Sequence, residues 1–303
     1  MGRQVTAISF AGKHSSFWAD LAVLGVAVVW GASYPVAKGA LAYAPVLLLI
    51  FYRFLSTAVV MSALARNDLA RAPRRDLLAG ALLGAILFLI FVAETYGVKL
   101  TTATNAALII SLCTIFIPFL EFGLRRQLPP TGVIAGAVVA VTGVGVLAGG
   151  MTGFNSGDLL VLAAAGLRTI MVVATKRVMT GRALSSAALT AAQASTVAGL
   201  TLVMLLAQGG PSALIVQADA QFWAAVAFLS LFCTIGAFYV QNAALRRTSP
   251  TRVSFLMGTE PVFGFALAWL FLSEPSTPFT VVGATLIVGG TFVGLATERS
   301  TRR

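Results

Sequence analysis

The stretch TTATNAALIISLCTIFIPFLEFGLRRQLPPTGVIAGAVVAVTGVGVLA, residues 101–148, decides the fold because the chain carries a second copy of it. Displacing the sequence by 147 residues superposes identical residues without a gap: Thr101, Thr104, Phe116, Leu120, Gly136, Ala137, Gly143 and Val146 fall on Thr248, Thr251, Phe263, Leu267, Gly283, Ala284, Gly290 and Val293. A repeat of this length in a chain of 303 residues indicates a duplicated unit. We therefore predict two halves, residues 1–150 and 151–303.

The composition indicates that these halves lie in a membrane. The chain is 58% hydrophobic and 10% charged, with a mean hydropathy of +0.92, whereas soluble domains carry about 25% charged residues. Its apolar residues form runs of about 20, the length at which a helix crosses a bilayer. The sequence therefore predicts an all-α integral membrane protein with ten transmembrane helices, at 18–38, 46–65, 77–98, 103–123, 130–149, 157–177, 185–207, 221–243, 252–272 and 278–297.

The 21 basic residues are distributed unevenly between the two sides of these spans. Lys38 and Lys99 lie on one side, and Arg53 and Arg168 lie within spans. All the others lie on the second side: Arg3, Lys13, Arg66, Arg71, Arg74, Arg75, Arg125, Arg126, Lys176, Arg177, Arg182, Arg246, Arg247, Arg252, Arg299, Arg302 and Arg303. Basic residues are retained on the cytoplasmic side, so both termini are expected there. The net charge of +11 then faces anionic lipid, and nucleic acid is not an expected partner.

Five spans in each half imply that the second half enters the membrane from the opposite side, as an inverted repeat. A displacement of 138 residues matches the first spans as well, because it places Asp20 and Leu21 on Asp158 and Leu159. Secondary transporters are built in this way, with a substrate site near the midplane between the halves. The sequence thus predicts alternating access about a central site.

Four short segments of the sequence form a recognisable set: Trp30-Gly-Ala-Ser-Tyr-Pro-Val-Ala-Lys38, Arg53-Phe54, Glu260-Pro261 and Ser273-Glu274. In these segments the chain resembles the drug/metabolite transporter superfamily and, more narrowly, its ten-span EamA-type members. The resemblance implies a basket-like bundle with a central cavity and the export of amino acids or related metabolites across the bacterial inner membrane. It also implies a proline in the fourth span of each half and a glutamate thirteen residues later. Pro261 and Glu274 fit this pattern, whereas the aligned positions of the first half hold Thr114 and Gln127.

Charged groups within spans are costly in hydrocarbon, so each is a candidate for the interior site. They are Arg53, Glu94, Arg168 and Glu260. The two displacements pair Arg168 with Trp30 and Glu94 with Gln241, and paired positions in an inverted repeat line the same space from opposite sides. We therefore expect Trp30, Glu94, Arg168 and Gln241 to line the cavity.

These residue types suit a zwitterionic substrate. Arg168 can hold a carboxylate through two parallel hydrogen bonds, and Glu94 can face an ammonium group or carry a proton. The aromatic rings of Trp30, Tyr34 and Tyr239 offer faces to an apolar side chain. Glu260, Pro261 and Glu274 are expected to serve coupling or gating, with helix breaks at Pro35, Pro118 and Pro261 as hinges.

Other interpretations remain open at this point. Arg53 with Glu94, or Arg168 with Glu260, would serve equally well as ion pairs that fix helix packing. Glu274 would equally well cap a helix, and Glu121 lies one turn from Arg125, where a pair at the membrane surface is expected.

The leading functional prediction is a secondary exporter of amino acids or similar metabolites, with proton coupling left open. The alternatives are a carrier of nucleotide-sugars, sugar-phosphates or cationic drugs, and a non-transport membrane enzyme. Cys113 and Cys233 lie inside spans, and the only histidine, His14, lies in the N-terminal tail. The sequence therefore offers no group of cysteines and histidines suited to catalysis or metal binding. No GxxxxGK[ST] motif occurs, so ATP-driven pumping is not expected. We expect no cofactor. The expected partners are a small-molecule substrate and the lipid bilayer, and the oligomeric state is left open.

Overall fold

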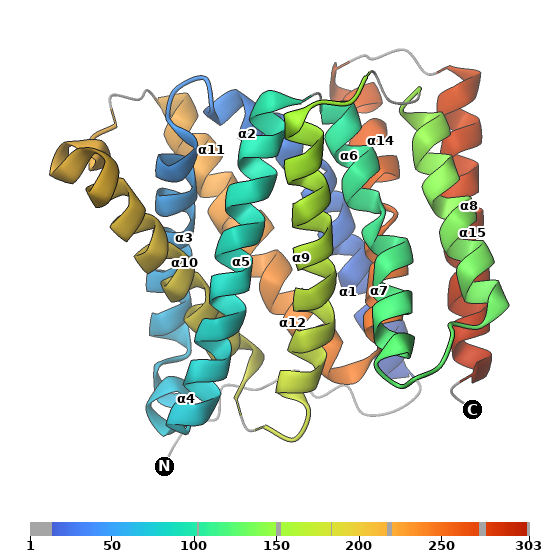
Figure 1. Cartoon of the computed structure of the whole chain (residues 1–303), viewed down its shortest axis with the longest axis horizontal. Coiled ribbons are helices and arrows are strands. Elements are labelled where there is room, and N and C mark those ends of the chain that lie inside the picture. The colour runs from blue at the N-terminus through green and yellow to red at the C-terminus, as the bar shows by residue number, and fades with distance from the viewer. Residues whose placement is uncertain are drawn as a thin grey trace.

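The computed structural model describes residues 14–101, 103–149, 153–182, 184–216, 220–272 and 277–301. In this part of the chain all regular elements are helices, and most run along one common direction (Figure 1). The elements of the first half are α1 (His14–Gly31), α2 (Ser33–Ala40), α3 (Val46–Leu64), α4 (Arg66–Arg71), α5 (Arg74–Leu100), α6 (Ala103–Ser111), α7 (Cys113–Gly123) and α8 (Thr131–Leu147). Those of the second half are α9 (Ser156–Met179), α10 (Ser186–Gly209), η1 (Gly210–Leu214), α11 (Ala220–Ser230), η2 (Leu231–Gly236), α12 (Ala237–Arg247), α13 (Pro250–Met257), α14 (Glu260–Leu272) and α15 (Pro278–Thr301).

The lengths of these helices make the chain a multi-pass membrane protein. Among the described residues, seven helical stretches are long and apolar enough to cross a bilayer, and two shorter apolar helices, Leu108–Gly123 and Thr131–Leu147, accompany them. The expected span 18–38 is divided at Ala32, close to Pro35. The expected spans 103–123 and 252–272, called here the divided helices, are each divided in two, at Leu112 and at Gly258–Thr259. The break expected at Pro118 is absent, because α7 continues through that residue. The number of ten spans therefore stays a prediction.

The two divided helices break at equivalent positions of the two halves, because the displacement of 147 residues places Leu112 on Thr259. Pro261 explains the second break, since its ring nitrogen cannot donate the hydrogen bond of a continuous helix. The breaks lie together: a Cβ atom built on Gly258 would be 2.7 Å from the hydroxyl of Thr114. Discontinuous helices therefore meet in the interior, as they do in transporters with broken spans.

A short π-helix, η2, interrupts the helix that runs from α11 to α12. Its wider turn changes the usual hydrogen-bond partners, and the hydroxyl of Thr234 donates to the carbonyl of Leu229 at 2.8 Å. The carbonyl of Cys233 is left to accept hydrogen bonds from side chains on other helices. Single π-turns of this kind occur often at functional sites.

Helices α8 and α15 form a separate pair at one edge of the molecule, at the right of Figure 1. Glycines bring their backbones into contact: a Cβ atom on Gly290 would lie 2.5 Å from the amide nitrogen of Ala140. Gly136, Gly143 and Gly283 likewise lie against backbone atoms of the partner helix, so these glycines serve close packing. The largest buried apolar cluster lies away from this pair, among α3, α5, α10, α11 and α12.

Candidate functional site

The centre of the molecule holds an ion pair between two long helices. Arg168 lies near the middle of α9, and its guanidinium contacts the carboxylate of Glu94 on α5 at 2.5 Å. The side chains are 17% and 14% exposed, so both charges are largely removed from solvent. The pair joins the two halves, and it is neither of the two ion pairs that the sequence left open, Arg53–Glu94 and Arg168–Glu260.

Trp30 contacts the cationic member of this pair through the face of its ring. The guanidinium carbon of Arg168 lies 5.3 Å from the centre of the indole ring, within the range of a cation–π interaction. The indole nitrogen donates to the carbonyl of Cys233 at 2.9 Å, and the ring packs against Phe238 at 5.5 Å between centroids. The π-turn η2 therefore fixes the orientation of the ring that carries Arg168.

Arg53 supports the same π-turn from α3. Its Nε atom donates to the hydroxyl of Thr234 at 2.6 Å, and a terminal nitrogen lies 3.4 Å from the carbonyl oxygen of Cys233. Its guanidinium carbon also lies 4.7 Å from the ring centre of Phe91. Arg53 thus stabilises the π-turn that orients Trp30.

A small cavity of about 20 Å³, measured as space open to the centres of water molecules, adjoins these groups. That volume suffices for about one water molecule and is too small for an amino acid. Its wall is mainly apolar and aromatic, with Arg168, Gln241 and Thr175 as its polar members. The lining residues are Trp30, Leu87, Ile90, Phe91, Arg168, Met171, Val172, Thr175, Phe238, Gln241 and Leu245.

Three of the residues expected at the cavity line it, whereas Glu94 contacts Arg168 but is not among the lining residues. The roles of all these residues in transport stay predictions. Trp30, Arg168 and Gln241 line the cavity, and the amide of Gln241 contacts the sulfur of Met257 at 3.3 Å. Tyr239 does not join them, because its side chain is 44% exposed. At about 100° per residue it points some 160° away from Gln241 around α12. The side chain of Tyr34 lies outside the described residues.

The sequence analysis missed Phe91, Phe238 and Thr175. A signal was present, since Phe91 and Phe238 each lie three residues before a predicted site residue, Glu94 and Gln241. Residues three apart share one face of a helix, so they follow from the same prediction. Thr175 lies two turns beyond Arg168 on the same face.

The residues expected to couple or gate transport lie close to this centre where they are described. Glu260 begins α14, directly after the break, and Arg168 and Glu94 are the charged groups that act on its carboxyl group. No hydrogen bond of this carboxyl group is formed within the described residues. Pro261 follows it in the first turn of α14, and Glu274 lies outside the described residues. No cluster of metal-binding side chains occurs in the described part of the chain.

Comparison with known sequences gives one family. The family described as EamA-like transporter family matches residues 17–149 and matches again over residues 155–295. The chain is 26% identical over 302 residues to the uncharacterized transporter YetK of Bacillus subtilis, covering 93% of this chain and 86% of that protein. It is 28% identical over 268 residues to a probable terminal-alkyne amino-acid exporter of Streptantibioticus cattleyicolor, covering 87% of this chain and 88% of the exporter.

Comparison with solved structures gives the same architecture. One crystal structure superposes with a TM-score of 0.78 at 21% sequence identity and covers 95% of this chain and 99% of its own. An identity this low relates the folds only. The family match confirms the predicted relationship to EamA-type proteins. The solved structure shows that the fold is shared.

Proposed function

The chain belongs to the EamA-like transporter family, and from that premise we propose that it is a secondary transporter that exports amino acids or related zwitterionic metabolites by alternating access. The family and the apolar helices make it a membrane transporter. Its proposed setting is the bacterial inner membrane, with both termini in the cytoplasm. The amino-acid substrate is supported by the name of one relative, a probable terminal-alkyne amino-acid exporter, and by the chemistry of the central ion pair.

The Arg168–Glu94 pair is the observation that carries this proposal. A zwitterion presents one carboxylate and one ammonium group on neighbouring atoms. Its carboxylate replaces Glu94 on the guanidinium of Arg168, and its ammonium group meets the carboxylate that Glu94 has freed. Both protein charges then stay paired in the loaded and the empty states, which avoids the cost of an uncompensated buried charge.

The aromatic wall suits the rest of such a substrate. Trp30, Phe91 and Phe238 would contact an apolar side chain through their ring faces and edges. Because the cavity holds only about one water molecule, the wall has to separate before substrate enters. A cycle in which the site opens to one side at a time provides that separation.

Alternating access is supported by the duplication. The same family matches the chain twice, and the broken helices of the two halves meet at equivalent positions. We propose that the ten spans form two inverted repeats, residues 1–150 and 151–303, and that the breaks at Leu112 and Gly258–Thr259 act as hinges.

A second candidate substrate, an organic cation exchanged for protons, is favoured by Glu260. Two carboxyl groups, Glu94 and Glu260, act near the single guanidinium of Arg168. This excess of acidic groups would accommodate a positive charge. Phosphorylated substrates would instead require several cationic groups at the cavity, where only Arg168 lies.

The experiment is uptake of labelled substrates into proteoliposomes, with and without a pH gradient. The panel contains neutral, aromatic, basic and acidic amino acids, uridine and a quaternary amine. The variants are Arg168→Ala, Arg168→Lys and Glu94→Gln, and the control is Arg177→Ala, an exposed position on the same helix.

We expect saturable uptake of neutral amino acids by the unmodified protein and by the control. Arg168→Ala should reduce the rate of amino-acid uptake at least about 100-fold. Removing one partner of a buried ion pair leaves the other charge uncompensated, which costs about 3 kcal/mol or more. Arg168→Lys should recover little of the loss because lysine lacks the forked geometry. Transport of the amine with no amino-acid uptake would reject the zwitterion site and favour the second candidate.

A further inference from the structure

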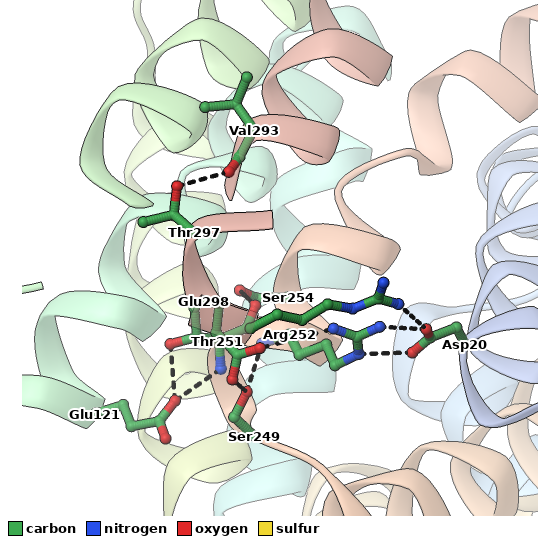
Figure 2. Close-up of polar contacts among 10 residues, drawn as sticks. Asp20, Glu121, Ser249, Thr251, Arg252, Ser254, Val293, Thr297 and Glu298 are labelled. Carbon is green, nitrogen blue, oxygen red and sulfur yellow. Dashed lines mark hydrogen bonds and ion pairs between the residues drawn. The ribbon is translucent and has the colours of Figure 1, made fainter. Parts of the chain in front are cut away.

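A second buried polar cluster lies far from the cavity, at the end of the bundle that carries most basic residues, here called the basic end. Figure 2 shows Arg252 of α13 reaching Asp20 of α1. Its Nε atom donates to Asp20 at 2.7 Å, and a terminal nitrogen forms a second, parallel bond to the other carboxylate oxygen. Another terminal nitrogen lies 3.7 Å from the carboxylate of Glu298 on α15. The side chains of Arg252, Asp20 and Glu298 are 5%, 15% and 4% exposed.

The same turn of α13 is tied to a further helix of the first half. Glu121 on α7 accepts hydrogen bonds from the backbone nitrogen of Thr251 at 2.8 Å and from its hydroxyl at 2.7 Å, as Figure 2 also shows. The hydroxyl of Ser249 donates to Glu298 at 2.7 Å. The expected Glu121–Arg125 pair is present at 3.0 Å, but Glu121 is only 6% exposed and mainly binds α13. The first turn of α13 thus joins α1, α7 and α15.

The opposite end of the bundle carries an equivalent contact. Asp158 on α9 accepts from the hydroxyl of Thr101 at 2.6 Å and lies 3.5 Å from the amide nitrogen of Asn105 on α6. Both Asp158 and Asn105 are fully buried. The displacement of 138 residues places Asp20 on Asp158, and the displacement of 147 places Asn105 on Arg252. Each contact therefore joins the first helix of one half to the divided helix of the other.

We propose that these two contacts are the gates of the transport cycle: Asp20–Arg252 closes the basic end, and Asp158–Asn105 closes the opposite end. The inference rests on the proposed function, because gates have a role only in a protein that alternates. Each contact forms when its end is closed and separates when that end opens. In this structure both are formed, in agreement with the contracted cavity between them.

Buried charges suit a gate that must open reversibly. Removing Arg252, Asp20 and Glu298 from water is costly, and their mutual attraction repays much of that cost. When the basic end opens and water enters, the lost attraction is exchanged for hydration, so the two states stay close in free energy. The gates are unequal, since one holds a guanidinium between two carboxylates and the other an amide beside one carboxylate.

The test follows the access of a thiol reagent to the cavity from each side. A single cysteine, Thr175→Cys, is placed in the cavity wall of a Cys113→Ala/Cys233→Ala protein, and a membrane-impermeant maleimide is added to right-side-out or inside-out vesicles. An exposed reporter on α4, Asn67→Cys, identifies the side on which the basic end lies. The gate variants are Asp20→Asn and Asn105→Ala, and the control is Arg299→Ala.

Asp20→Asn should raise the rate of labelling from the basic side about tenfold or more and lower it from the other side. A tenfold change requires a bias of only about 1.4 kcal/mol between the two conformations. Asn105→Ala should have the opposite effect. Arg299 lies 3.4 Å from Asp20 but is 64% exposed, so its loss should leave both rates within about twofold.

The proposal is overturned if Asp20→Asn leaves both rates unchanged, or if both rise together, since a loosened fold opens both ends. Glu298→Gln supplies a milder variant that keeps the Asp20–Arg252 pair, and a smaller shift in the same direction is expected. Labelling needs no substrate. If the gate variants change the labelling rates as expected but the protein takes up no amino acids, only the proposed substrate is rejected. If the protein takes up amino acids but the gate variants leave the labelling rates unchanged, only the proposed gates are rejected.

Discussion

Trp30 combines two roles that are seldom filled by one side chain. Its ring face carries the guanidinium of Arg168, and its ring nitrogen uses a carbonyl that the π-turn has left available. A shift of the backbone at Cys233, or a change at Arg53, which contacts the same carbonyl, would therefore alter the position of Arg168 through Trp30. The position of the central charge is thus set by three helices and by no single residue.

Replacing the indole tests this arrangement. Trp30→Phe keeps an aromatic face for Arg168 but removes the donor to the carbonyl of Cys233. We expect a loss of about 1 kcal/mol in the free energy of unfolding, the net value of one hydrogen bond. The KM for the transported substrate should rise several-fold while folding is retained. Thermal unfolding in detergent and proteoliposome uptake measure the two effects.

Trp223→Phe is the matched control for that variant. Trp223 is 43% exposed and contacts the rings of Tyr52 and Phe222 far from Arg168 along the chain. A small loss of stability with unchanged KM is expected there. Equal effects of the two variants on KM would contradict a positioning role for Trp30.

The sequence singled out Trp30, Glu94 and Arg168, which the structure brings together, and their role in transport stays a prediction. These residues could be found because charged or amphipathic groups inside an apolar span have few reasons to be there. Asp20 and Arg252 could not be found in the same way, because they lie near span ends, where charges are common. Tyr239 is exposed and not a lining residue of the cavity, and the sequence could not show this because an aromatic residue on a membrane helix faces lipid as readily as it faces an interior.

Among the helices, α8 and α15 differ from the rest in how they pack. Glycines on both helices bring their backbones into contact, so we expect the two helices to behave as one unit. The gate residue Glu298 lies at the end of this unit, on α15. We expect the pair to stay fixed while α13 and α14 move against it.

A single methyl group tests that packing. Gly290→Ala places a Cβ atom 2.5 Å from the backbone nitrogen of Ala140, so the helices must separate. The free energy of unfolding should fall by about 1–3 kcal/mol, the usual cost of overpacking. Gly289→Ala meets nothing within 4 Å and should be neutral or slightly stabilising, because alanine favours helix over glycine. Equal melting temperatures for the two variants would contradict this account.

The existence of the helices was predictable, and their interruptions were predictable only in part, since α7 runs through Pro118 without a break. Hydropathy located the apolar runs to within a few residues because the bilayer imposes a length on each span. Pro261 signalled the break in the ninth expected span, but Leu112 has no proline within one turn before or after it. The π-turn η2 left no signal either, since LFCTIG reads as ordinary apolar helix.

At the scale of the whole molecule, the orientation in the membrane rests on the basic residues. Asn67 on α4 and Ser212 in η1 are exposed positions that the expected topology places on opposite sides. In intact cells, a cysteine at Ser212 should react with a membrane-impermeant maleimide, and one at Asn67 should react only after lysis. The reverse result would invert the proposed topology, and reaction of both would contradict the alternation of the spans.

The contracted cavity has a consequence for the energy supply of the cell. A water-filled passage through the bilayer would conduct protons along its hydrogen-bonded water and dissipate the membrane potential. Here the cavity beside Arg168 admits about one water molecule, and buried polar contacts join the helices toward each end of the bundle. We therefore expect an idle copy of the protein not to conduct protons, so that a cell can keep many copies in its membrane without loss of its proton gradient.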